Sequence, residues 1–168
     1  MIFRWRRRGS KIGVLLVCRA NVCRSPMAEA LLAHKLDLAG RAGQIRTDSA
    51  GTGAFPGQAV DPRAKKVLEA EGIPLRRKRA RPLGPDDFEA HDFILAMDGK
   101  VLEHLHAHCP APLREKLHLV TRWSPELEGS DIPDPYYGNL SGFERVHGLL
   151  DGALDAFIEK ALLPALPR

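Results

Sequence analysis

The pattern of apolar and polar positions along the chain begins with one strongly apolar segment. Residues Lys11–Val17 are almost all aliphatic or β-branched, which is typical of a strand buried on both faces of a parallel sheet. After Ser25 and Pro26, the segment MAEALLAHKL spaces its apolar residues as a helix does. Pro26 suits a first helical turn because its missing N–H would have no partner there. The sequence therefore opens as strand, loop and helix.

The same alternation continues to the C-terminus. A Gly- and Pro-rich loop is expected over Ser49–Val60, after a second strand. The further predicted strands are Ile45–Asp48, Phe93–Met97 and Leu117–Val120, and the further helices are Asp61–Glu71, Gly99–His108 and Ser141–Leu162. Strands that alternate with helices predict a single doubly wound α/β domain with a parallel sheet flanked by helices. Such sheets bind ligands at the carboxyl ends of their strands, and the loop from Cys18 to Arg24 lies at such an end.

Composition narrows the class of protein. A chain of 168 residues, 44% of them hydrophobic, is long and apolar enough for one compact domain. Its apolar runs fall well short of the ~20 residues of a membrane span, and no apolar segment of signal-peptide length precedes the first strand. Three cysteines, at 18, 23 and 109, are too few for a disulfide scaffold. We therefore expect a cytoplasmic protein without a membrane span.

Charge is unevenly distributed along the chain. The formal net charge is +4, and Lys11 with the four arginines before it supplies five positive charges, which leaves the remainder nearly neutral. Residues 1–10 are predicted to be a flexible basic arm and residues 11–168 the folded domain. Nothing in the arm specifies a base contact, so no nucleic-acid partner is expected. A second basic run at 76–81 faces either an anionic substrate or solvent.

The chemistry is concentrated in the run VCRANVCRSP, where five residues separate Cys18 from Arg24. A loop of this length between strand and helix can turn successive N–H groups inward, forming an anion site at the helix N-terminus. These groups and Arg24 favour the thiolate form of Cys18, which makes it a nucleophile. The guanidinium of Arg24 can hold two phosphate oxygens, and Ser25 can donate a hydrogen bond to the sulfur. A cysteine-dependent phosphatase is predicted.

The run VCRANVCRSPMAEA resembles the signature of low-molecular-weight protein-tyrosine phosphatases, V-C-x-G-N-[IV]-C-R-S-P. Further matches follow in the right order: DSAGTGAF at Asp48–Phe55, FILAMD at Phe93–Asp98 and DPYYG at Asp134–Gly138. The resemblance spans Lys11 to the C-terminal helix. It implies a four-stranded parallel sheet, no cofactor, and hydrolysis of phosphotyrosine through a phosphocysteine. It also implies a phosphotyrosine-bearing partner protein, with a bacterial tyrosine kinase as one candidate.

The resemblance assigns roles to individual residues. Asp134 matches the general acid, which protonates the leaving oxygen and then, as a carboxylate, activates water. Asp131 is the alternative acid in the same loop. The loop-bracing residues implied are Asn21, Ser25 and Ser49. The substrate-binding residues implied are the loop positions Arg19, Ala20, Asn21, Val22, Cys23 and Ser25, with Phe55, Tyr136 and Tyr137 as an aromatic wall.

Several positions depart from the family pattern or leave alternatives open. Ala20 stands where the family commonly has Gly, which would cost ~1 kcal/mol if the residue needs a positive φ. Lys78 stands where many relatives have His, so the bracing network is expected to be rewired. Cys23 either forms a protective disulfide with Cys18 or is a buried apolar thiol. The segment HLHAHC at 104–109 offers a conceivable transition-metal site, although no carboxylate completes a ligand pattern.

Three other functions compete with the phosphotyrosine hypothesis. A thiol-coupled arsenate reductase needs relay cysteines, and Met97 stands where one is typical. A phosphoarginine phosphatase of the same family usually has Thr at the position of Val22. A binding module for phosphate or nucleic acid has no need for Asp134. The sequence therefore favours the phosphotyrosine phosphatase.

Overall fold

The computed structural model describes residues 10–76 and 78–167, so residues 1–9 of the predicted arm lie outside the described part. Within that part, four strands form one parallel sheet in the order β2-β1-β3-β4. The strands are β1 (Ile12–Cys18), β2 (Ile45–Gly51), β3 (Phe93–Ala96) and β4 (Leu117–Leu119). The helices are α1 (Arg24–Leu38), α2 (Pro62–Ala70), α3 (Asp86–Ala90), α4 (Gly99–His108) and α5 (Leu140–Phe157), with a 3-10 helix at Ala111–Lys116 and a π-helical turn at Ile158–Leu162.

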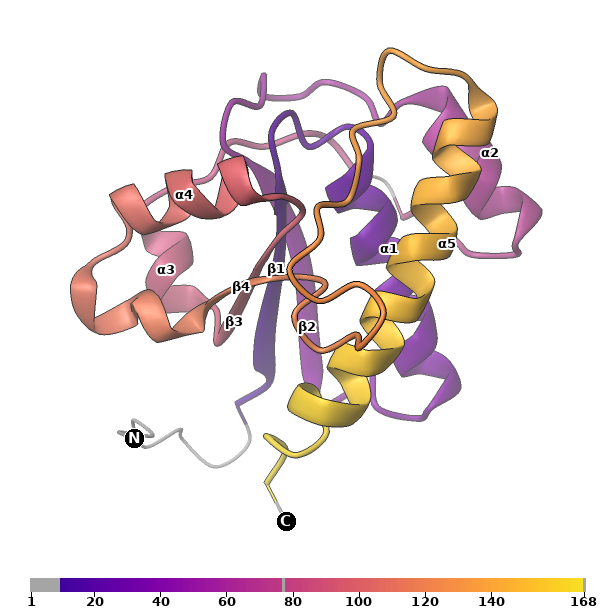
Figure 1. Cartoon of the computed structure of the whole chain (residues 1–168). Helices are drawn as coiled ribbons and strands as arrows, with labels where there is room; N and C mark the ends of the chain where they lie inside the picture. The colour runs from indigo at the N-terminus through magenta and orange to yellow at the C-terminus, as the bar shows by residue number, and fades with distance from the viewer. Residues whose placement is uncertain (1–9, 77, 168) are drawn as a thin grey trace.

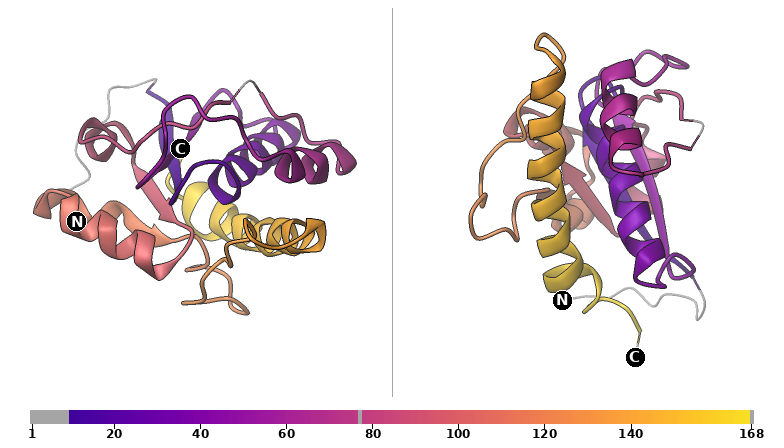
Figure 2. Two further views of the ribbon diagram at one scale, coloured as in Figure 1. Left: turned by 90° about the horizontal axis from the view of Figure 1, so that it is seen from above. Right: turned by 90° about the vertical axis from the view of Figure 1, so that its right-hand side faces the viewer.

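Helices cover both faces of the sheet. Helices α1, α2 and α5 lie together on one face, and α3 and α4 lie on the other (Figures 1 and 2). Side chains of β1 alternate between the two apolar clusters: Val14 and Leu16 pack with the α1 and α5 side, and Leu15 and Val17 with the α4 side. The predicted four-stranded, doubly wound α/β domain is therefore confirmed.

Most boundaries agree with the sequence pattern to within one residue, and two of the differences bear on the site. The helix predicted after Pro26 already begins at Arg24, because the loop that follows β1 runs directly into the first helical turn. Strand β2 continues through Ser49 to Gly51, three residues that the sequence pattern assigned to a loop. These residues pair with Leu16, Val17 and Cys18 and are buried, so β2 runs as far along the sheet as β1 does.

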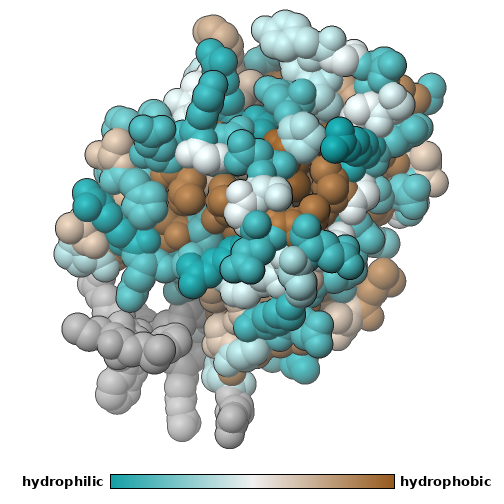
Figure 3. Space-filling view, viewed as in Figure 1, coloured by the Kyte–Doolittle hydropathy of each residue, from teal (hydrophilic) through white to brown (hydrophobic). Residues whose placement is uncertain are grey.

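The face shown in Figure 3 is mostly polar, with apolar surface gathered in its middle, between α4 and α5 of Figure 1. Among the described residues, no helix is long and apolar enough to cross a membrane. The carboxyl ends of β1 and β2 meet at one edge of the sheet. The loop after β1, the turn after β2 and the segment before α5 converge there, and this convergence creates the candidate site (Figure 1).

Candidate active site

A cavity of about 270 Å³ lies at the carboxyl end of β1. Its lining contains the predicted nucleophile, clamp, acid and aromatic residues together. The lining residues are Cys18, Arg19, Ala20, Val22, Cys23, Arg24, Gly53, Phe55, Gln58, Asp134, Tyr136 and Tyr137. Asn21, Ser25 and Ser49 do not line it and lie behind the loop, where all three are fully buried.

The loop after β1 turns sharply at Asn21, which has a φ of 55°. It is the one non-glycine residue in the described part of the chain with a positive φ, so Ala20 carries no such strain. The concern raised by the missing family glycine therefore does not apply at Ala20. Gly51 packs against this loop so closely that a Cβ there would lie 2.5 Å from the carbonyl oxygen of Arg19. Only glycine allows that approach.

The sulfur of Cys18 lies at the centre of the loop and receives two polar contacts. The backbone N–H of Asn21 donates to Sγ at 3.3 Å, and the hydroxyl of Ser25 lies 3.0 Å from it. Cys18 ends β1, and α1 begins at Arg24, so the positive end of the helix dipole faces the same place. A negative charge on the sulfur or on a bound anion is stabilised there.

A chain of buried hydrogen bonds fixes which way the Ser25 hydroxyl points. The backbone N–H of Arg81 donates to Oδ1 of Asn21 at 3.0 Å, so the amide nitrogen of Asn21 faces the two serines. Nδ2 donates to the hydroxyl oxygens of Ser25 (2.8 Å) and Ser49 (2.9 Å). Each serine must therefore donate elsewhere: Ser49 to Glu29 at 2.5 Å, and Ser25 to the sulfur of Cys18.

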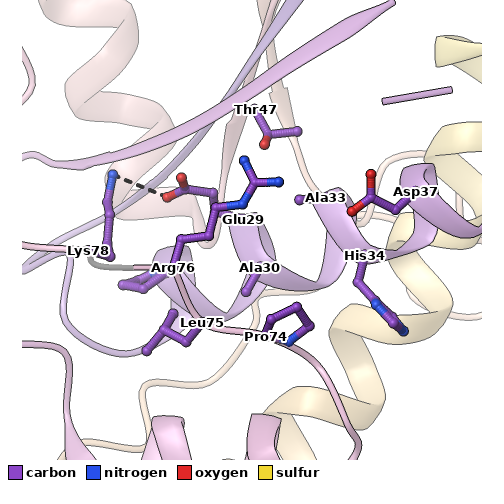
Figure 4. A pocket seen from close by; sticks show the side chains of 11 residues that line it. Glu29, Ala30, Ala33, His34, Asp37, Thr47, Pro74, Leu75, Arg76 and Lys78 are labelled. Carbon is purple, nitrogen blue, oxygen red and sulfur yellow. Dashed lines mark ion pairs between the residues drawn. The ribbon is translucent and has the colours of Figure 1, made fainter. Parts of the chain in front are cut away.

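Lys78 contacts the Glu29 end of this series of hydrogen bonds. Its ammonium lies 3.1 Å from Glu29 and 3.0 Å from Asp48, and it also donates to the carbonyl of Ser49. Lys78 and Glu29 line a second, smaller cavity of about 110 Å³ beside α1, where Figure 4 shows their ion pair. Lys78 thus joins the bracing network through ion pairs and a hydrogen bond to the backbone of β2. Burial alone would raise the pKa of Asp48, but hydrogen bonds from Arg81 and Lys78 outweigh it and lower the pKa.

Arg24 is 3% exposed, and acidic groups aim its guanidinium into the cavity. Nη1 donates to Asp98 at 2.7 Å and to the carbonyl of Ile132 at 2.8 Å, while Nη2 lies 3.7 Å from Asp134. Asp98 was not predicted as a site residue, although it ends the FILAMD run. Its other carboxylate oxygen caps α4 at Val101, so one side chain orients both the helix and the clamp.

The carboxylate of Asp134 is half exposed and faces the cavity, as a general acid must. Asp131, the alternative acid, instead accepts a hydrogen bond from the backbone N–H of Gly99 at 2.8 Å and does not line the cavity. The aromatic residues form an exposed rim: Tyr137 is 95% exposed, Phe55 76% and Tyr136 43%. The two tyrosine rings contact each other edge to face, 5.0 Å apart.

The three cysteines are free and buried. Burial, reinforced by the nearby carboxylate of Asp61, raises the pKa of Cys23 to about 12, so Cys23 is a neutral thiol at physiological pH. Cys109 lies away from the site, between α4 and the 3-10 helix.

The histidine segment shows no ligand cluster. The rings of His104 and His108 stack on each other at 4.1 Å, and no group of three or more candidate metal ligands occurs within residues 10–76 and 78–167.

The chain is similar to known proteins over most of its length. Residues 13–163 match the family model described as low molecular weight phosphotyrosine protein phosphatase. A Schizosaccharomyces pombe protein with that description is 40% identical over 134 residues, covering 79% of this chain and 85% of the relative. The structure of a protein tyrosine phosphatase from Entamoeba histolytica superimposes with a TM-score of 0.86 at 31% identity, covering 93% of this chain and all of the other. The YwlE arginine phosphatase superimposes with a TM-score of 0.81 at 25% identity, covering 89% of this chain and 97% of the other.

Proposed function

Because the chain belongs to the low-molecular-weight phosphotyrosine protein phosphatase family, and is a hydrolase of that class, we propose that it hydrolyses phosphotyrosine through a phosphocysteine formed on Cys18. The observation that carries the proposal is the convergence of three groups in one cavity. Cys18, Arg24 and Asp134 all line it. Nucleophile, charge clamp and proton donor are the groups that phosphoryl transfer through a covalent intermediate requires.

In the first step, the phosphate dianion binds in the loop, held by backbone N–H groups and by Arg24. The thiolate of Cys18 attacks phosphorus, so that an S–P bond forms as the P–O bond to the tyrosine oxygen breaks. Asp134 donates its proton to the departing phenolate oxygen. Arg24 stabilises the charge on the equatorial oxygens of the transferring group, and Asp98 keeps the guanidinium in place for it.

In the second step, the carboxylate of Asp134 takes a proton from water, and the water oxygen attacks phosphorus. The S–P bond breaks, releasing inorganic phosphate and the thiolate of Cys18. Ser25 stabilises that leaving thiolate, because the hydrogen bond from Asn21 leaves the hydroxyl proton of Ser25 directed at the sulfur. A related observation supports the covalent intermediate: a Cys-to-Ser variant of the YwlE phosphatase carries a phosphorylated active-site serine.

The rim of the cavity favours phosphotyrosine as the substrate. A flat aryl group can lie against Phe55, Tyr136 and Tyr137, whereas the shorter phosphoserine would forfeit that contact or leave its phosphate short of Cys18. The similarity to YwlE makes phosphoarginine the second candidate substrate. Val22 lines the cavity and offers no hydroxyl to a guanidinium, which argues against phosphoarginine.

Further parts of the proposal concern regulation and setting. Cys23 protects Cys18 from irreversible oxidation by forming a disulfide with it.

The protein acts in the cytoplasm on a phosphotyrosine-bearing partner, such as a bacterial tyrosine kinase, and requires no metal or cofactor. Asn21, Ser25 and Ser49 support the loop, and the basic residues 1–10 are not required for the chemistry.

Leaving-group dependence tests the assignment of Asp134. Asp134→Asn should slow hydrolysis of phosphotyrosine strongly but that of a nitrophenyl phosphate much less, because nitrophenolate needs little protonation to leave. Asp131→Asn is the matched control and should slow neither substrate, since Asp131 binds Gly99 outside the cavity. Equal losses on both substrates in Asp134→Asn would contradict its role as the acid.

Matched phosphopeptides test the substrate. We expect catalytic efficiency to fall from phosphotyrosine to phosphoserine by at least about a hundredfold, or ~2.7 kcal/mol. Equal rates on the two, or a preference for phosphoarginine, would overturn the substrate assignment and leave the cysteine chemistry in place.

A further inference from the structure

Arg19, at the mouth of the catalytic cavity, is a cation without a polar partner among the described residues. Its side chain is exposed and lines the cavity, yet its guanidinium makes no hydrogen bond or ion pair within residues 10–76 and 78–167. The neighbouring charges are all engaged. Arg24 binds Asp98 and lies 3.7 Å from Asp134, and Arg63 beside the mouth binds Asp61.

The base of the Arg19 side chain is held rigidly. Its carbonyl accepts a hydrogen bond from Gly53 at 2.8 Å, and the carbonyl of Cys18 accepts one from Thr52 at 3.0 Å. The Cγ atom of Arg19 lies 3.9 Å from the place that a Cβ on Gly53 would occupy, so its aliphatic stem runs along the turn after β2. The stem is therefore positioned by the loop, while the charged end has no polar contact with the described residues and is available to a ligand.

A bound substrate brings negative charge to this cavity in two places. The phosphoryl group sits deep in the loop with Arg24, whereas the peptide around the phosphotyrosine stays at the rim, because the tyrosine side chain is long. Neighbouring peptide residues lie only ~3.5 Å apart along an extended chain, so their side chains pass within reach of a long arginine. A carboxylate there would find Arg19 free and would not have to displace an existing partner.

We propose that Arg19 is a specificity-determining residue that selects phosphotyrosine sites flanked by aspartate or glutamate. The inference rests on the proposed function and names the class of phosphopeptide that the same site takes. An exposed ion pair is worth up to ~1 kcal/mol, which corresponds to a preference of up to about fivefold at low ionic strength. Salt screens such a pair, so the preference should shrink as ionic strength rises.

A double-mutant cycle tests this. Two phosphotyrosine peptides differ in one residue, Glu or Gln, directly before the phosphotyrosine, and a second pair places the same change directly after it. Catalytic efficiencies are measured for the wild type, for Arg19→Gln and for the control Arg145→Gln, which removes an exposed arginine of α5. We expect the wild type and Arg145→Gln to prefer the Glu peptide of at least one pair about two- to fivefold, and Arg19→Gln to show no preference.

Other outcomes would overturn the inference in distinguishable ways. If Arg19→Gln slows the Glu and Gln peptides by the same factor, Arg19 acts on the phosphoryl group itself. If the wild type shows no preference in either pair, the flanking carboxylate is not recognised. If no peptide and no aryl phosphate is hydrolysed, the proposed function fails, and this inference fails with it.

Discussion

Replacing Asn21 should separate the contribution of loop hydrogen bonds from that of backbone strain. Asn21 is fully buried at a φ of 55°, a conformation that costs an ordinary L-residue ~1–2 kcal/mol. Its side chain makes three hydrogen bonds, with Ser25, with Ser49 and with the backbone N–H of Arg81. Asn21→Ala loses all three bonds and keeps the strain, whereas Asn21→Gly loses the bonds and relieves the strain.

The magnitudes follow from these contacts. Three buried hydrogen bonds at ~1 kcal/mol each amount to ~3 kcal/mol, and the strain adds ~1 kcal/mol for alanine. If the loop must be correctly formed in the transition state, kcat/KM for an aryl phosphate should fall on the order of a hundredfold in Asn21→Gly. Asn21→Ala should be slower again by about fivefold, which is the factor that ~1 kcal/mol represents.

Steady-state kinetics on a nitrophenyl phosphate, with thermal unfolding measured in parallel, checks both numbers. Asn21→Gly should also remove the direction imposed on the Ser25 hydroxyl, so kcat should fall along with kcat/KM if breakdown of the phosphocysteine limits turnover. Wild-type activity in Asn21→Gly would refute the reasoning, because the hydrogen bonds would then be dispensable. Equal activity of the two variants would show that backbone strain contributes nothing.

Three further predictions concern other parts of the chain. Deleting Met1–Ser10 should leave turnover of small aryl phosphates unchanged in steady-state assays, because the first residue of β1 lies ~20 Å from Cys18, the last residue of that strand. A large loss of turnover in a folded protein would contradict this. Mild peroxide should inactivate the enzyme reversibly through a disulfide between Cys18 and Cys23, and mass spectrometry that finds only sulfinic or sulfonic acid would rule that disulfide out. Burial, with the nearby charge of Arg122, lowers the pKa of His118 from 6.5 to about 4. As the pH falls from about 6.5 to 4, His118 is therefore protonated in the unfolded chain but stays neutral in the folded one, so the folded state loses stability. His118→Gln should therefore lose less thermal stability than the wild type on acidification from about pH 7 to pH 4.5, and an identical loss would contradict the assignment.

The sequence predicted the sheet and the site better than it predicted the short helices and the contacts that orient the site residues. Strand β1 and the Cys18–Arg24 loop follow from a long apolar run and a dense local motif. Helix α3 has five residues and the 3-10 helix six, too short for helical periodicity to show. The contacts that aim Arg24 come from Asp98 and Ile132, far away along the chain, and only the folded sheet brings them together.

The same reason explains why the sequence did not show which loop residue has a positive φ. The pattern drew attention to Ala20, because the family commonly has glycine there. The positive φ falls on Asn21, whose side-chain partners come from α1, β2 and the segment at Arg81. A local motif cannot show which residue a three-dimensional network holds in that conformation.

Trapping the phosphoenzyme tests the central claim most directly. Wild-type protein is mixed rapidly with an aryl phosphate and quenched in acid, and the peptide that contains Cys18 is analysed by mass spectrometry. The mechanism predicts one phosphoryl group on Cys18, and near-complete loss of turnover in both Cys18→Ser and Arg24→Ala. Steady turnover without any phosphorylated Cys18, or Cys18→Ser retaining more than about a few per cent of wild-type turnover, would contradict the covalent mechanism.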